Sequence, residues 1–380
     1  MQVARGTARV LSLAALGALA APAAHAQGAL GGATANGMYR LFVDSQHVLV
    51  RSFIEDCLVP VAGDANLTLH WNNERVTIPG VSAPPGSQEA IDAITTASRP
   101  ISGDAYQDYQ KVRNELEGRV ARGGASVGYY HSSEADYLAQ QVSATYARDV
   151  QDDQLNLSVG SSYGWDNIEP LANNRSTTAP DHKNTLHWNA VATRVLTPVT
   201  VLRCGVEYNH VEGLQHNPYR LVYAGGTSVP EHHPDSRQRA DAFMKFHQYL
   251  PNRSSLKADY RFYTDDWGIR SHELAGTLSQ YVTRGLYAEY VYRWYTQTAA
   301  SFYRPDYLST SGVDGYLTGD YRMSPLSSSL FGISMNANFG VLAPGTPTLR
   351  RFALSLDYER YFNSNNYSAD ILETGLEFRF

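Results

Sequence analysis

The sequence predicts an all-β fold, a transmembrane antiparallel up-and-down β-barrel of about 16 strands with short periplasmic turns and long external loops. Two observations carry this prediction. Runs of about ten residues alternate apolar and polar side chains, as expected for tilted strands with one face in lipid. The last ten residues, ILETGLEFRF, form such a run and end in an aromatic residue.

The beginning of the chain has the pattern of an exported protein. Arg5 and Arg9 precede an apolar stretch and a small-x-small cleavage pattern. We expect residues 1–26 to be a signal peptide, residues 27–36 a flexible Gly/Ala-rich segment, and residues 37–380 a single transmembrane barrel domain. Removing the leader with its two arginines changes the formal net charge from −6 to −8. An acidic exported chain argues against nucleic acid as a partner.

The composition is compatible with a membrane only if the protein crosses it as a barrel. No later stretch approaches the roughly 18 consecutive apolar residues of a transmembrane helix, and only helices and closed barrels satisfy their backbone in lipid. The mean hydropathy of −0.35 reflects strands with one face in a polar lumen. We therefore expect an integral protein of the cell outer membrane of a Gram-negative bacterium, with membrane lipid and the barrel assembly machinery as partners.

The period of two can be followed along the mature chain in order, and no helical spacing is sustained. Residues 38–44 form the first expected strand, which should pair with the last one. Clear alternating runs follow at residues 155–165, 256–263, 286–295 and 352–359. The even strand number brings both ends of the chain to the same side of the membrane.

The connections between the runs alternate between short and long. Tight turns are expected at residues 123–124, 151–154, 197–199, 251–254 and 283–285. Long loops are expected at residues 79–111, 166–182, 211–236 and 297–324. In bacterial barrels the short turns are periplasmic, so this pattern predicts the orientation.

The last strand predicts both how the chain assembles and what faces its lumen. Leu376, Phe378 and Phe380 share the outward parity and resemble the terminal assembly signal of outer-membrane barrels. The inward parity of this and other strands is charged. The expected lumen charges are Arg203, Glu207, Arg239, Asp241, Lys245, Lys257, Asp259, Arg261, Glu289, Arg293, Asp357, Glu359, Glu373, Glu377 and Arg379. They either create a transverse field that filters solutes or pair into a ladder that fills the lumen.

Two features of the loop at residues 211–236 suggest a role. Pro218, Tyr219 and Arg220 form a candidate gating loop that folds inward, with Arg220 held by a lumen carboxylate. A histidine cluster could bind a metal, but its variable spacing favours a solvated loop, and we predict no metal site. Its members are His210, His216, His232 and His233.

The DDWG segment and the two cysteines are the remaining candidates for chemistry. Asp265-Asp266-Trp267-Gly268 is ordinary turn composition, with Trp267 able to anchor at the headgroup level. A carboxylate site with His272 as base is the less favoured alternative. Cys57 and Cys204 are expected to point to opposite faces of distant strands and to stay unpaired.

Several segments resemble an uncharacterised family of Gram-negative outer-membrane proteins, domain of unknown function 3570. The family carries PYR, DSR and DYRxYxDDWGIxSHT motifs in this order. Here they appear as HNPYRLVY (216–223), PDSRQRADAF (234–243) and DYRFYTDDWGIRSHEL (259–274), followed by AASFYRPDY (299–307). The chain departs from the family pattern at VTIPGVSAPPG (76–86). The resemblance implies a barrel over essentially the whole mature chain and supplies no activity or catalytic residue.

These observations favour a non-enzymatic, porin-like passive channel for small polar solutes, without a cofactor. One alternative is a scaffold or conduit for a periplasmic redox partner of flavin chemistry, suggested only by the resemblance. A surface hydrolase is the other alternative, and the sequence offers no register of catalytic residues for it.

Overall fold

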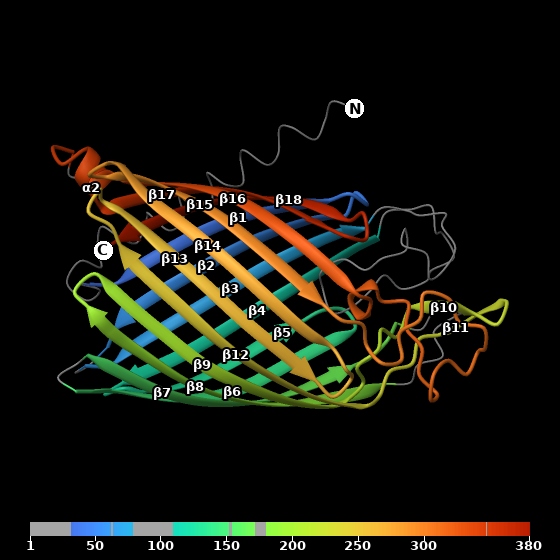
Figure 1. Cartoon of the computed structure of the whole chain (residues 1–380). Helices are drawn as coiled ribbons and strands as arrows, with labels where there is room; N and C mark the ends of the chain where they lie inside the picture. The colour runs from blue at the N-terminus through green and yellow to red at the C-terminus, as the bar shows by residue number, and fades with distance from the viewer. Residues whose placement is uncertain (1–31, 62–63, 79–108, 152–153, 172–179, 347) are drawn as a thin grey trace.

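The computed structural model describes residues 32–61, 64–78, 109–151, 154–171, 180–346 and 348–380, and it forms the predicted barrel (Figure 1). Sixteen antiparallel strands close into one sheet in the order β1-β18-β17-β16-β15-β14-β13-β12-β9-β8-β7-β6-β5-β4-β3-β2. Their bounds are β1 Thr34–Asp44, β2 Leu49–Pro60, β3 Asn66–Ile78, β4 Tyr109–Arg122, β5 Ala125–Ser133, β6 Tyr137–Val150, β7 Leu155–Ile168, β8 Asp181–Thr197, β9 Thr200–Gly213, β12 Ser236–Tyr249, β13 Ser254–Asp265, β14 Arg270–Thr283, β15 Leu286–Gln297, β16 Leu326–Asn338, β17 Phe352–Asn363 and β18 Ser368–Arg379.

The first and last strands close the barrel as predicted. β1 pairs with β18 in a register that places Leu41 opposite Leu372. β1 begins at Thr34, so the expected flexible segment 27–36 is wrong for its last three residues, whose backbone groups are paired in the sheet. The rest of that segment and the expected signal peptide lie outside the described residues.

The two rims of the barrel differ, and we call them the turn end and the loop end. The predicted turns at residues 123–124, 197–199, 251–254 and 283–285 lie at the turn end with the C-terminus (Figure 1). This end also carries an unpredicted longer connection, residues 339–351, which contains α2 (Phe339–Leu342) and the 3-10 helix η3 (Leu349–Arg351).

The opposite rim carries the predicted long loops, with some changes. β4 begins at Tyr109, so the expected loop 79–111 ends earlier, and residues 79–108 lie outside the described part of the chain. The loop after β9 contains a hairpin of β10 (Leu221–Ala224) and β11 (Thr227–Pro230), which projects beyond the barrel (Figure 1). The loop after β15 contains the 3-10 helix η2 (Tyr321–Met323).

The outer face of the barrel is largely apolar. Val159, Val206, Leu274 and Phe331 lie at outward positions and are each at least half exposed. No helix within the described ranges is long and apolar enough to cross a membrane.

β2 reverses the usual pattern of faces. Val50 and Ile54 point inward and are buried, while Arg51 and Glu55 lie on the outer parity. Inside the barrel, Phe42, Val48, Val50 and Val76 belong to one apolar cluster at the loop end. The inner face is therefore apolar where it is packed rather than solvated.

This reversal corrects the prediction for the cysteines. Cys57 shares the outer parity of β2, and Cys204 lies opposite the outward Met244. The prediction of opposite faces is wrong, because the charged parity of β2 is the outer one. Both cysteines are free, on strands that are far apart in the barrel.

Candidate functional site

The register places the predicted lumen charges on one continuous inner face. Lys245 lies opposite Arg203 on β9 and opposite Asp259 on β13. Asp357 lies opposite Glu373, which lies opposite Arg40 on β1. The other predicted charges share this parity, namely Glu207, Arg239, Asp241, Lys257, Arg261, Glu289, Arg293, Glu359, Glu377 and Arg379.

Many of these charges form ion pairs across neighbouring strands. Arg261 lies 3.3 Å from Glu207 and 3.2 Å from Asp241. Lys257 lies 3.6 Å from Glu289. The pairing matches the ladder hypothesis, but the basic members stay accessible, with 47% of the Arg261 side chain and 44% of the Lys257 side chain exposed. The inner wall thus presents paired charges of both signs to open space.

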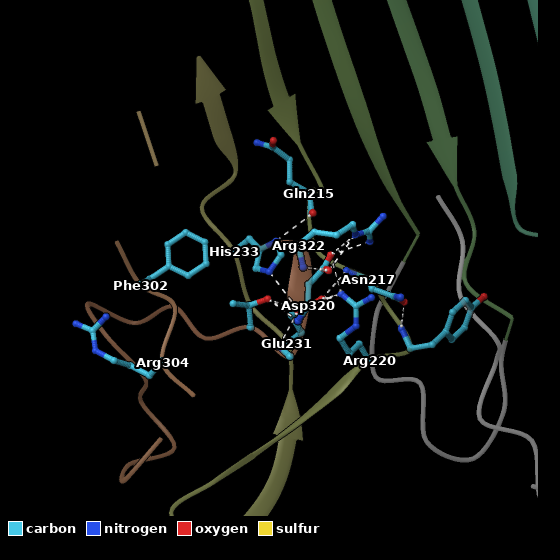
Figure 2. A network of polar contacts seen from close by, with 12 residues as sticks. Gln215, Asn217, Arg220, Glu231, His233, Phe302, Arg304, Asp320 and Arg322 are labelled. Atoms are coloured by element: carbon cyan, nitrogen blue, oxygen red, sulfur yellow. Dashed lines mark hydrogen bonds and ion pairs between the residues drawn. The ribbon is translucent and has the colours of Figure 1, made fainter. Parts of the chain in front are cut away.

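At the loop end, the segment Pro218-Tyr219-Arg220 is held by carboxylates that contact Tyr219 and Arg220, and Figure 2 shows the contacts of Arg220. The Tyr219 hydroxyl donates to Asp136, between β5 and β6, over 2.6 Å. Arg220 lies 3.0 Å from Glu231 and 3.2 Å from Asp320. The expected lumen carboxylate is therefore wrong, because the partners of Arg220 come from the loops after β11 and β15.

Glu231 is the centre of this network, with no exposed side-chain surface. It accepts hydrogen bonds from the backbone N–H of Asn217, the hydroxyl of Thr318 and the backbone N–H of Gly319. Burial disfavours its ionised form, but the Arg220 guanidinium and His233 outweigh burial and hold the pKa of this carboxyl well below its usual range. The ionised Glu231 carboxylate thus joins two loops.

Asp320 and His233 extend the network on either side of Glu231 (Figure 2). Burial opposes ionisation of Asp320, but Arg220 and Arg322 hold its pKa below the usual range. His233 is buried, with Nδ1 3.2 Å from the carbonyl oxygen of Gln215 and Nε2 3.3 Å from the Glu231 carboxylate. Both ring nitrogens thus face oxygen acceptors.

The histidines of this loop come together only in part. The rings of His216 and His232 lie 5.8 Å apart and those of His216 and His233 6.3 Å apart, whereas His210 pairs with Glu212. Burial and the neighbouring His233 lower the pKa of His216. The described part of the chain contains no group of residues suited to hold a metal ion.

Arg237 and Asp265 form the second buried pair at this end. Arg237 Nε donates to Asp265 Oδ2 over 3.0 Å. Trp267 is only 4% exposed, donates from Nε1 to the Ser236 carbonyl, and lies under the Arg237 guanidinium at 4.2 Å. The expected headgroup anchor is therefore wrong, because Ala300 and Phe302 of the next loop pack with Trp267 in one buried cluster.

The residues of the hydrolase alternative are not assembled. Asp265 is neutralised by Arg237, and Asp266 accepts from the backbone N–H of Gln238. His272 has the outward parity of Leu274 and lies 2.8 Å from the Tyr260 hydroxyl. The carboxylates and the proposed base thus have other partners on different faces.

A cavity of about 530 Å³ lies between these loops and the inner wall. Loop residues His216, Asn217, Pro218, Arg220, His233, Asp320 and Arg322 share its lining with strand residues Lys183, Arg237, Arg239, Tyr263 and Tyr295. The PYR segment therefore folds over the barrel mouth. Sequence reasoning missed Asp136, Glu231, Thr318, Asp320 and Arg322, which are isolated loop residues without a periodic pattern.

The expected assembly signal lies at the closing seam. The Phe378 ring packs on Phe352 with a centroid distance of 4.9 Å and on Phe380 at 4.8 Å. Leu376 lies opposite Gly37, and the backbone N–H of Phe380 donates to Ala33 over 3.1 Å. The C-terminal residue is thus bonded to the chain that leads into β1.

Solved structures similar to the chain are outer-membrane proteins of low sequence identity. The siderophore receptor PirA from Pseudomonas aeruginosa is 9% identical with a TM-score of 0.43, over 88% of this chain and 56% of the receptor, so the chain spans about half its length. The outer-membrane protein OmpT of Vibrio cholerae, as a loop L8 deletion mutant, is 9% identical with a TM-score of 0.43, over 92% of this chain and 99% of that one. OpdK of Pseudomonas aeruginosa, solved with vanillate, is 8% identical with a TM-score of 0.42, over 91% and 98%.

A comparison with curated proteins gives no match. A family model does match, over residues 20–369, which include fifteen strands of the barrel in full and only Ser368 and Ala369 of β18. The PYR, DSR and DDWG segments that carry the resemblance converge on the loop-end network and its cavity. The chain belongs to the family described as Protein of unknown function (DUF3570).

Proposed function

We propose that the protein is an outer-membrane channel through which small polar solutes pass passively. The observation that supports this most is the accessibility of inward-facing charges. Arg40, Lys245, Lys257, Arg261 and Arg293 point into a closed barrel, yet 41% to 53% of each side chain is exposed. A barrel of this strand number is wide enough for an aqueous passage.

The loop network gives this channel a narrowed entrance. Tyr219, Arg220 and Glu231 tie the loops across the mouth, where the cavity of about 530 Å³ is the space enclosed by loops and wall. Solutes that enter from the loop end meet this cavity before the wider lumen. The entrance is polar, which suits polar solutes.

Planar-bilayer recording of the purified, folded protein tests the channel. We expect stepwise conductance in potassium chloride, and a folded barrel without conductance steps would contradict the proposal.

The ion pairs of Arg220 with Glu231 and Asp320, which we call the latch, can be tested separately from the channel. Arg220→Ala removes the ion pairs to Glu231 and Asp320 and should increase single-channel conductance. Arg304→Ala is the matched control, because Arg304 lies in the loop after β15 that also carries Asp320. Its guanidinium donates to the carbonyl oxygens of Ser301 and Tyr303, away from the network (Figure 2). An equal effect of both variants would argue against a latch.

A further inference from the structure

The loop-end cavity has a surplus of basic side chains on its lining. Five basic residues line it together with two acidic ones, the basic set being Lys183, Arg220, Arg237, Arg239 and Arg322 and the acidic set Asp136 and Asp320. Both acids already have cationic partners, since Lys111 lies 3.2 Å from Asp136 and Arg322 lies 2.7 Å from Asp320. Of the basic residues, Lys183 is paired with Asp166, Arg220 with Glu231 and Arg322 with Asp320, so the two arginines of β12 remain to be accounted for.

The surplus is concentrated at two arginines on one face of β12. Arg237 and Arg239 are two residues apart, so both point inward, and Asp265 is the residue opposite Arg239 in register. Asp265 is already occupied. Its Oδ2 accepts from Arg237 and from the Tyr263 hydroxyl, and its Oδ1 accepts from the backbone N–H of Ile269. Asp265 thus lies beside two guanidiniums in the sheet register but forms an ion pair with Arg237.

Arg239 is consequently left without an anionic partner. Its Nε is buried and donates to no acceptor, and it forms no ion pair among the residues that the structure describes. The next inward acid on β12, Asp241, lies 3.2 Å from Arg261. A buried Nε–H without an acceptor is costly, so this position favours an anion that supplies the absent acceptor.

We propose that the loop-end cavity binds the oxyanion of a small solute, a carboxylate or a phosphate, through Arg239 and Arg237. A planar guanidinium binds either group through two parallel hydrogen bonds. The volume of about 530 Å³ is within the range of small-molecule pockets. This inference rests on the proposed channel function, because it names the class of solute that would be selected at the entrance.

Titration calorimetry on the purified full chain in detergent tests the site without requiring conduction. The probes are succinate, inorganic phosphate and, as an uncharged control, glycerol. We expect saturable binding of at least one oxyanion and none of glycerol, and the two anions distinguish a carboxylate site from a phosphate site. Absence of saturable binding of both anions would overturn the proposal.

Arg239→Gln should weaken anion binding by at least about tenfold, because it removes a charge-assisted contact. Arg203→Gln is the matched control, with the same charge change on the inner face of β9 but outside the cavity. It should change binding by less than about twofold, since exposed charges interact weakly through water. Equal weakening by both variants would indicate diffuse attraction and sink the site.

A second variant of Arg239 tests the site if Arg239→Gln does not fold. Arg239→Lys retains the charge but lacks the planar guanidinium, so unchanged binding of both anions by that variant would contradict a bidentate site. Bilayer recordings separate this proposal from the channel itself. Conductance without saturable anion binding would support the channel proposal and contradict the anion site. Arg239-dependent binding without conductance would support the anion site and contradict the channel proposal.

Discussion

At the residue scale, Glu231 links the two loops that meet at the loop end. Its carboxylate is fully buried and holds Arg220 on one side and Thr318 on the other. Removing one partner of a buried ion pair costs about 3–5 kcal/mol, because the other charge is left without compensation. Glu231→Gln should therefore release residues 214–235 from the mouth while the barrel stays folded.

The same carboxylate predicts an acid dependence. Its pKa is lower in the folded protein than the ordinary value, so its contribution to stability is complete above about pH 4.3 and is lost as the pH falls below that value. Hydrogen exchange of residues 214–235, corrected for intrinsic rates, should increase from pH 7 to pH 3.5 in the wild type. Glu231→Gln should show fast exchange at both values, and slow exchange at pH 7 would contradict the assignment.

At the element scale, neighbouring residues of β14 face opposite sides of the barrel wall, one the outer surface and the next the lumen. Leu274 on β14 is half exposed on the outer face, and Ala275 points inward beside Asp259. Leu274→Arg should destabilise the barrel by about 2–4 kcal/mol if the site lies near mid-membrane. Ala275→Arg should cost much less, because the lumen accepts charge. Urea unfolding in lipid vesicles measures both, and equal costs would contradict the assignment of faces.

β2 shows where periodicity alone misleads at this scale. Val50 packs inside the barrel with Phe42 and Val76, while Arg51 and Glu55 lie on the outer face. A period of two identifies a strand and its two faces. It does not say which face is inside, because a packed lumen segment is as apolar as a lipid-facing one.

At the scale of the whole molecule, closure depends on both ends of the chain. β1 and β18 pair along their full length, and the Phe380 backbone bonds to Ala33. Deleting Phe380 removes this bond and the ring contact with Phe378, so we expect a lower yield of assembled barrel in membranes. Heat-modifiable migration on gels measures it. Normal yield of folded barrel would show that the C-terminal aromatic is dispensable.

The sequence by itself determined the strands, their approximate number and the closing pair, because alternation, turn residues and the need to satisfy every backbone group in lipid are local or topological constraints. The parity of β12 and β13 likewise placed Asp241 and Arg261 on one face. The tertiary structure decided the entrance. Arg220 and Glu231 belong to the loop after β9, and Asp320 belongs to the loop after β15. No period relates loop residues, so the contact between them depends on how two loops fold over one mouth.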